Sequence, residues 1–258
     1  MKFSLFNHPG CVSRIFALLL AGLLAAPAFA APDMKAVFAS PFNGKAGTEL
    51  NKVVNQPAAL RWSRALAGVT TTGKGTLRLR ADGMQDGVEA MAFLPLNKLV
   101  QPGQILWLIV EFEGWKFTGG RDEQLRIGFM HGNTGENPPP LAQMRFTRGS
   151  KGVLLAGEAF NTAQGATHIA SQPVAPAETS ERQIFALEYV PAENRYTLYR
   201  HSGGEKFEPL GSGTTSAQRK PNFLRLHLRG DFASTPDEFV DIGNLLLFVA
   251  SPSGNAAR

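Results

Sequence analysis

Three basic side chains alternate with leucines in residues 223–230, which read F-L-R-L-H-L-R-G. Successive side chains of a strand point to opposite faces. The leucines would therefore share one face, and the other face would carry Arg225, His227 and Arg229. Guanidinium groups bind carboxylate and sulfate through paired hydrogen bonds. The pattern predicts a strand that packs its leucines into a core and offers a basic face to anions.

The same alternation recurs in T-L-R-L-R-A, residues 76–81, where Arg78 and Arg80 share a face. Arg126 and Arg145 lie in two further apolar stretches. If these strands are neighbours in one sheet, their arginines form a cationic floor that suits uronates or sulfated sugars. The alternative is that they are ordinary surface arginines, which often pair with glutamates of adjacent strands.

The basic face also contains the residue types that β-elimination from a uronate requires. A cation such as Arg225 or Arg229 can stabilise the enolate-like intermediate, and His227 can remove the α-proton. The flanking cations would lower the pKa of His227. A lyase that uses these three residues is therefore the alternative to a binding protein.

The acidic stretch D-E-F-V-D, residues 237–241, has a spacing that argues against glycoside hydrolysis. The two carboxyl groups of a glycosidase stand about 5–9.5 Å apart in one cleft. Glu238 and Asp241 are three residues apart, so a regular strand turns them to opposite faces. Asp237 and Asp241 share a face, but at about 3.3 Å per residue they lie about 13 Å apart. The expectation is that Asp237 and Glu238 are solvated residues at the entry to the strand and that Asp241 is structural.

Two tryptophans flank the apolar stretch I-L-W-L-I-V-E-F-E-G-W, residues 105–115. Trp107 and Trp115 are an even number of residues apart, so a regular strand would place both on one face. Trp107 lies among aliphatic residues and is expected in the core. Trp115, beside Lys116, is the candidate for stacking on a sugar ring.

Other common chemistries have no motif here. The sequence contains no phosphate-binding glycine loop, H-E-x-x-H or G-x-S-x-G. The histidines lack zinc-ligand spacing, and the single cysteine, Cys11, precedes the expected mature chain. No nucleic-acid partner is expected, because the chain lacks a high density of Lys and Arg and its N-terminus predicts export.

The elements expected to position these residues are almost all strands, because short period-two runs recur between Gly, Pro, Asn and Asp. Eleven strands without intervening helices indicate an all-β, two-sheet antiparallel sandwich. Residues 132–140 and 161–180 are expected to be loops. The expected strands, within about 2–4 residues, are 36–42, 75–81, 88–94, 104–113, 124–131, 142–148, 151–157, 183–190, 195–201, 222–229 and 239–249.

The N-terminus has the features of a signal peptide over residues 1–30: basic residues, an apolar run and A-P-A-F-A before the cleavage point. The apolar run, residues 15–26, is shorter than the about 20 residues that span a bilayer, so no membrane anchor is expected. Cleavage would remove Lys2 and Arg14 and lower the formal charge from +5 to +3. Residues 31–258 would form one exported sandwich domain, periplasmic or extracellular.

Three stretches resemble strands of the concanavalin A-like jelly rolls, the superfamily of laminin-G-like modules, lectins and glucanases. They are F-A-S-P-F-N-G-K-A-G-T-E-L-N, Y-V-P-A-E-N-R-Y-T-L-Y-R and F-V-D-I-G-N-L-L-L-F. The resemblance implies a jelly roll over residues 35–250 and a glycan ligand. It also allows a structural calcium at Asp241, for which an Asp bonded to a turn is the alternative.

One stretch resembles a strand of the jelly-roll alginate lyases. L-R-I-G-F-M-H-G, residues 125–132, places His131 at the histidine of their Q-I-H strand, but Phe129 stands where the glutamine should be. The expected function is therefore glycan binding without catalysis, with a preference for acidic glycans. A polysaccharide lyase is the first alternative, and a structural or adhesive surface protein is the second.

Overall fold

The computed structural model describes residues 34–63, 69–80, 90–119, 122–132, 140–160, 166–203, 206–215, 219–230 and 237–251. The predicted signal peptide, residues 1–30, lies outside these ranges, so it stays a prediction. Within them, no helix is long and apolar enough to cross a membrane.

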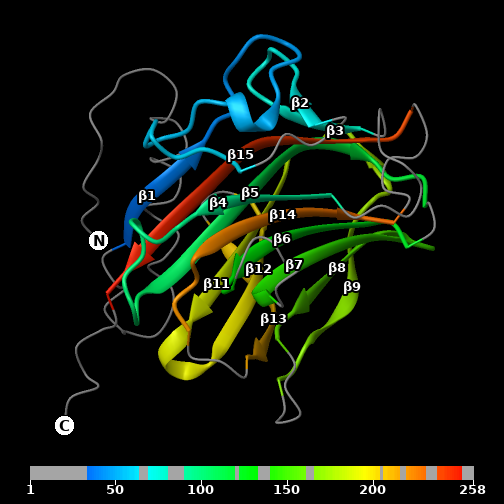
Figure 1. The fold of residues 1–258 in the computed structure, drawn as a ribbon. Helices are drawn as coiled ribbons and strands as arrows, with labels where there is room; N and C mark the ends of the chain where they lie inside the picture. Colours follow the sequence, from blue (N-terminus) through cyan, green and yellow to red (C-terminus); the bar gives the residue numbers. More distant parts are fainter. Residues whose placement is uncertain are drawn as a thin grey trace, which may run out of the picture.

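The described strands form two antiparallel sheets packed face to face (Figure 1). This confirms the predicted all-β sandwich. All eleven expected strands are present, and the described residues contain four more: β2, β9, β10 and β13. The strands are β1 (Met34–Ser40), β2 (Val69–Thr71), β3 (Leu77–Arg80), β4 (Ala90–Pro95), β5 (Ile105–Lys116), β6 (Gln124–Met130), β7 (Pro140–Gly149), β8 (Gly152–Glu158), β9 (Ile169–Ala175), β10 (Glu178–Thr179), β11 (Gln183–Val190), β12 (Arg195–His201), β13 (Phe207–Thr214), β14 (Phe223–Arg229) and β15 (Phe239–Ala250).

The nine-stranded sheet, sheet A, has the order β13-β12-β11-β5-β15-β3-β2. The long strand β15 pairs along one side with β5, and along its other side first with β3 and then with β1. Short β10 pairs with the end of β5. Two 3-10 turns, η2 (Leu50–Lys52) and η3 (Pro191–Glu193), connect strands.

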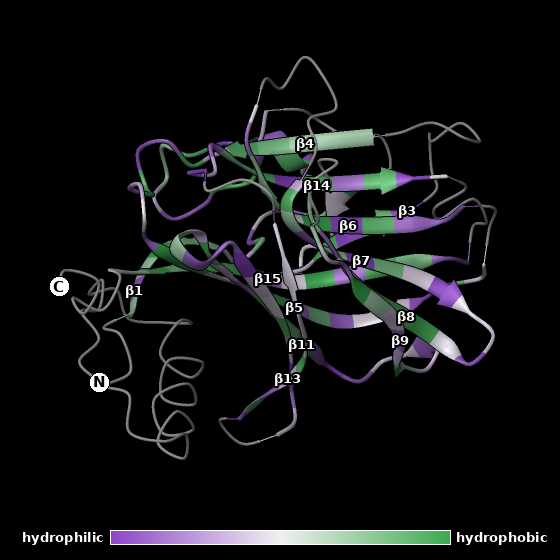
Figure 2. Ribbon diagram, turned by 90° about the horizontal axis from the view of Figure 1, so that it is seen from below, coloured by the Kyte–Doolittle hydropathy of each residue, from purple (hydrophilic) through white to green (hydrophobic). Residues whose placement is uncertain are grey.

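The six-stranded sheet, sheet B, has the order β4-β14-β6-β7-β8-β9. Apolar and polar residues alternate along its strands (Figure 2). Leu224, Leu226 and Leu228 of β14 are fully buried in the core between the sheets, as their spacing predicted. The alternate residues of the same strands therefore point to the outer face of sheet B.

A bulge in β5 changes which of its side chains enter the core. Asp241 pairs with Gly114 and the next residue of β15 pairs with Phe112, so Glu113 is an extra residue. Phe112 and Trp115 consequently both lie in the core, although they are three positions apart. Trp107, before the bulge, points to the outer face of sheet A.

That outer face carries a small apolar cluster of its own. Trp107 stacks on Tyr199 with ring centroids 4.7 Å apart, beside buried Leu246 and Phe248. The expectation that Trp107 lies in the main core is therefore wrong.

Candidate functional site

The largest group of predicted site residues meets on the outer face of sheet B. Strands β14, β6, β7, β8 and β9 are consecutive neighbours there, and their registers align side chains in two rows across the sheet. The first row contains Arg225, Gly128, Gln143 and Glu158. The second row contains His227, Arg126, Arg145 and Ala156.

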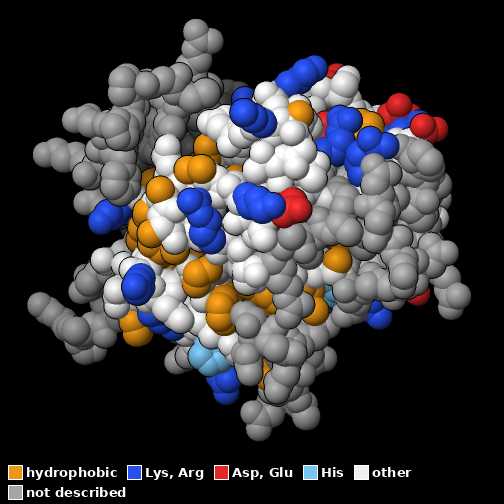
Figure 3. Space-filling view, turned by 45° about the horizontal axis from the view of Figure 1, so that its top comes forward, with side chains coloured by type: hydrophobic (Ala, Val, Ile, Leu, Met, Phe, Trp, Pro, Cys, Tyr) orange, Lys and Arg blue, Asp and Glu red, His pale blue; other side chains and the backbone are white. Residues whose placement is uncertain are grey.

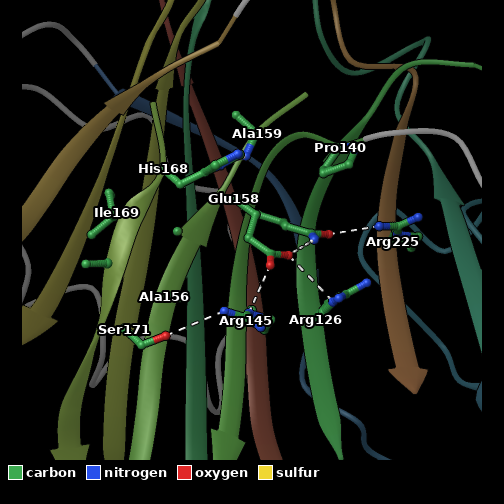
Figure 4. A pocket seen from close by; sticks show the side chains of 13 residues that line it. Arg126, Pro140, Arg145, Ala156, Glu158, Ala159, His168, Ile169, Ser171 and Arg225 are labelled. Carbon is green, nitrogen blue, oxygen red and sulfur yellow. Dashed lines mark hydrogen bonds and ion pairs between the residues drawn. The ribbon is translucent and has the colours of Figure 1, made fainter. Parts of the chain in front are cut away.

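The three arginines of the two rows form one connected polar network with Gln143 and Glu158 (Figure 4). Arg225 Nη2 donates to Gln143 Oε1 at 2.9 Å, and Gln143 Nε2 donates to Glu158 Oε2 at 2.6 Å. Arg145 Nε lies 2.9 Å from Glu158 Oε1, and Arg126 Nε lies 3.6 Å from Glu158 Oε2. One carboxylate therefore orients two arginines directly and a third through Gln143.

Gly128 makes the first row continuous. A Cβ at this position would lie 2.3 Å from the Ala142 carbonyl oxygen and 2.4 Å from the Cα of Gln143. The row thus has no side chain between Arg225 and Gln143, and the guanidinium reaches across β6 to the amide. Only glycine allows this close approach of two strands.

The network borders a pocket of about 470 Å³. Its lining combines the arginines and Glu158 with His168, with Ser171 and with small residues including Ala156 and Ala170. Arg145 and Glu158 keep about a quarter of their side-chain surface exposed, at 27% and 24%, whereas Arg225 is 2% exposed. Arg145 and Glu158 are therefore the charged groups best placed to touch a ligand.

The charge of the pocket is positive. Arg126, Arg145 and Arg225 contribute +3 and Glu158 contributes −1, which leaves +2 when His227 is neutral. His227 is fully buried beside the network, and burial lowers its pKa to about 3, with further lowering by Arg225, Arg126 and then Arg229. His227 is consequently uncharged near neutral pH.

Four residues of this site were absent from the sequence prediction: Gln143, Glu158, His168 and Ser171. Glu158 could have been found, because it falls on the same alternation as Ala156 in a stretch correctly predicted to be a strand. Ser171 could not, because it lies within residues 161–180, which were expected to be a loop. A bulge in β9 between the partners of Leu155 and Gly157 leaves both Ala170 and Ser171 exposed.

Arg78 and Arg80 do not join this site, because β3 belongs to sheet A. The expectation of a single floor containing all the arginines is therefore wrong. Arg78 instead forms a two-point ion pair with Asp241 of neighbouring β15, with Nε at 2.7 Å from Oδ1 and Nη2 at 2.5 Å from Oδ2. Its guanidinium lies 4.5 Å above the Phe239 ring.

Two further predicted residues lie away from the pocket. Arg229 shares the outer face of sheet B but is exposed at the end of β14 and does not line the pocket. Trp115 is fully buried, and its indole N–H donates to the Pro176 carbonyl oxygen at 2.9 Å. A hollow of about 430 Å³ borders Trp115, but with no exposed surface the ring has no face for a sugar. The bulge at Glu113 is the physical reason for this correction.

Asp241 does not fit a calcium site. Calcium takes six to eight oxygen ligands, which requires carboxylates that are available to it. Both oxygens of Asp241 are bound to the Arg78 guanidinium, which occupies the place of a cation. Among the described residues, no three His, Cys, Asp or Glu side chains are grouped as a metal site would need.

The remaining acids of residues 237–241 have separate surroundings. Glu238 is buried and accepts the Thr118 backbone N–H at 2.9 Å, and Asp237 is exposed. Asp241 is bound to Arg78. Asp237 and Asp241 therefore have the roles expected of them. The expectation that Glu238 is solvated is wrong, because its carboxylate is buried against the Thr118 backbone.

The face drawn in Figure 3 shows how the surface cations are distributed there. Several Lys and Arg side chains lie singly among hydrophobic and other side chains, and a denser group of them lies at the upper right beside Asp and Glu. Cations and anions are therefore mixed on that face.

This chain is similar to solved structures in its fold, but the comparisons of its sequence found no match. No family model matches it, and neither does any curated protein. The exoplasmic/lumenal domain of VIP36, in a form with Ca²⁺ and Man3GlcNAc bound, is 11% identical with a TM-score of 0.50, over 79% of this chain and 87% of that chain. The CBM2 module of the evolved Dit of Lactobacillus casei BL23 phage J-1 is 10% identical with a TM-score of 0.50, over 85% and 97%.

At such identities the likeness concerns the arrangement of the strands. VIP36 is a lectin domain of the concanavalin A-like fold, with which the two antiparallel sheets of this chain are consistent. The fold expected from the three resembling stretches is thereby confirmed: this chain is a concanavalin A-like jelly-roll sandwich.

Proposed function

We propose that this protein binds an anionic glycan in the arginine-lined pocket on the outer face of sheet B. The observation that carries the proposal is the convergence of Arg126, Arg145 and Arg225 on a pocket of about 470 Å³ with a charge of +2. Guanidinium groups match carboxylate and sulfate in geometry and charge. The volume lies in the usual range for small-ligand sites, about 300–1,000 Å³.

The fold adds support of a weaker kind. The VIP36 domain has a mannose-containing glycan bound, and it shares the sandwich architecture with this chain. A shared fold does not assign a function, so the ligand class rests on the pocket. Export rests on residues 1–30 of the sequence alone.

The surroundings of His227 favour binding over β-elimination. A general base works best when its pKa lies near the working pH. His227 has a pKa of about 3, is fully buried, and does not line the pocket. It therefore lacks both the basicity and the access that removal of a sugar proton requires.

The test is calorimetric titration of residues 31–258 with oligosaccharides of alginate, polygalacturonate and hyaluronan, and with neutral mannan as a comparison. We expect binding of at least one acidic ligand and none of mannan. Arg145→Gln should weaken that binding about tenfold or more, as for loss of one charge-assisted hydrogen bond. Arg195→Gln is the matched control, because Arg195 also pairs with a glutamate, Glu188 at 2.8 Å, but in sheet A.

Three results would overturn the proposal. Absence of binding to every acidic ligand would favour a structural or adhesive protein. Equal loss of affinity in Arg145→Gln and Arg195→Gln would place the ligand elsewhere. Appearance of the ultraviolet absorbance of an unsaturated sugar would identify a lyase, and its loss in His227→Ala would assign the base.

A further inference from the structure

Beside Arg145 the pocket is lined by residues with small side chains. Ala156 faces Arg145 across the β7–β8 pair, on the outer face of sheet B. Ala159 and Ala170 extend this lining toward β9. A larger residue at position 156 would occupy the space between the arginine and β9. The small side chain therefore leaves room for a ligand group at one particular point.

Two hydrogen-bonding groups face each other across this point. Arg145 Nη2 lies 3.5 Å from Ser171 Oγ, which is a long hydrogen bond (Figure 4). A carboxylate oxygen placed beside this pair, on the pocket side, could accept a shorter bond from each, because arginine has five N–H donors in a planar fork and serine has a rotating hydroxyl. The long direct bond therefore leaves both groups able to donate to one acceptor.

His168 supplies a further donor at the rim. It is exposed, and its Nδ1 accepts the Ala159 backbone N–H at 3.2 Å. A neutral imidazole that accepts at Nδ1 carries its proton on Nε2. His168 thus presents an N–H group to the pocket that it lines.

Glu158 restricts which groups of a ligand can lie next to it in the pocket. Its carboxylate accepts a hydrogen bond from Gln143 and forms an ion pair with Arg145, and it remains partly exposed to the pocket. A carboxylate has about four lone-pair sites, so it can accept from a sugar hydroxyl as well. A second anionic group of the ligand would be repelled at the same place.

We propose that the pocket holds one uronate residue, with its carboxylate above Ala156, within hydrogen-bond reach of both Arg145 and Ser171, and a hydroxyl donating to Glu158. This rests on the proposed function and narrows it. The arrangement selects sugars with one carboxylate and free hydroxyl groups over multiply sulfated sugars. Glu158 is the residue that sets this preference.

The test uses three probes: a galacturonate trisaccharide, its methyl ester, and a heparin-derived trisaccharide of comparable length. The wild-type chain should bind the galacturonate at least tenfold more tightly than either of the others. Ala156→Leu should weaken galacturonate binding tenfold or more without altering any charge. Ala192→Leu, on the exposed turn η3 of the molecule, is the matched control.

Two other variants keep the proposal testable if Ala156→Leu fails to fold. Ser171→Ala should weaken galacturonate binding about threefold to fivefold, because one hydrogen bond to the carboxylate is lost. Glu158→Gln should raise the affinity for the heparin-derived probe relative to galacturonate by about tenfold. The melting temperature of each variant reports whether the fold is intact.

The outcomes separate the two proposals. If the wild-type chain binds no acidic probe, both are wrong. If it binds and Arg145→Gln abolishes binding, but Ser171→Ala and Ala156→Leu do not change it, the pocket binds anions and the position of the uronate is wrong. If Glu158→Gln leaves the ratio between sulfated and carboxylated probes unchanged, the selective role of Glu158 is wrong.

Discussion

Individual residues of the pocket show how a basic group can be buried in this fold. Arg225 is 2% exposed but its guanidinium donates to Gln143, which connects it to the carboxylate of Glu158. His227, in the neighbouring row, is kept neutral because burial and three arginines disfavour its charged form. The site therefore contains cations only where an acceptor accompanies them, as the cost of burying an unpaired charge requires.

The low pKa of His227 makes the stability of the fold depend on pH. The unfolded chain takes up the histidine proton near pH 6.5 and the folded protein only near pH 3, so between these values the unfolded state binds more protons. The contribution of His227 to the free energy of unfolding is fully present above pH 6.5 and is lost as the pH falls toward 3. This contribution is at most about 5 kcal/mol.

The measurement is urea unfolding of the wild-type chain and His227→Gln between pH 7 and pH 4. The free energy of unfolding should decrease more steeply on acidification in the wild type, since glutamine does not titrate. Parallel curves for the two proteins would show that His227 is readily protonated in the folded state.

The ion pair between Arg78 and Asp241 should contribute modestly to stability. Its geometry is two-pointed, but 37% of the Arg78 side chain is exposed and solvent screens the interaction. In a double-mutant cycle with Arg78→Gln and Asp241→Asn, we expect a coupling energy of about 1 kcal/mol. Addition of EDTA should leave the melting temperature unchanged, and a decrease would mean that a cation is bound after all.

At the scale of elements, bulges decide which predicted contacts form. Alternation placed Arg225 and His227 on the correct face because β14 pairs regularly with both of its neighbours. It failed to separate Trp115 from the face of Trp107 because Glu113 is an extra residue in β5. A bulge depends on pairing with a distant strand, and the local pattern of hydrophobic residues does not reveal it.

The strands that the sequence pattern missed are mostly at sheet edges. β9 and β13 each contain a proline, at Pro173 and Pro209, and both lie at an edge of their sheet. Proline lacks the N–H that the interior of an inner strand must donate, so it is accepted within an edge strand or at the first residue of a strand, as at Pro140 of β7. These segments have the composition of loops, and the neighbouring strand is what makes them part of a sheet.

Gly128 should be the most sensitive glycine of the candidate site. In Gly128→Ala the new methyl group would overlap the backbone of β7, which has to move away. We expect a loss of about 2 kcal/mol in the free energy of unfolding, within the usual range for overpacking. Gly44→Ala is the control, since its nearest contact would be 3.4 Å and its cost should be small. Equal stability of both variants would show that β6 and β7 can separate without cost.

At the scale of the whole molecule, the assignment of strands to sheets was the information missing from the sequence. Alternation tells which side chains of a strand share a face, but two strands with the same pattern can belong to different sheets. Arg80 and Arg225 illustrate this, because their strands have similar sequences and lie in sheets A and B. The sandwich could be predicted from the period-two pattern of the sequence. Which residues line the pocket could not, because that depends on how strands distant in the sequence pair.

The overall charge predicts how salt should affect ligand binding. A formal charge of +3 for residues 31–258 gives little long-range attraction, so the attraction must come mainly from the pocket. Salt screens exposed charges over about 10 Å at 0.1 M. The affinity for an acidic oligosaccharide should therefore decrease severalfold between 0.05 M and 0.5 M NaCl, and less so in Arg145→Gln. Identical salt dependence in the two proteins would mean that Arg145 does not contact the anion.

The places of β14 and β15 determine when this chain can fold. β14 lies between β4 and β6, and β15 lies between β5 and β3, so the last strands along the chain are inner strands of both sheets. Until residues 223–250 have been synthesised, each sheet is divided and the pocket lacks Arg225. Closing such long loops makes folding slow. We expect a nascent chain of this topology to lack complete sheets until residues 223–250 have been made, and a chain without complete sheets is the form that a narrow translocation channel would admit.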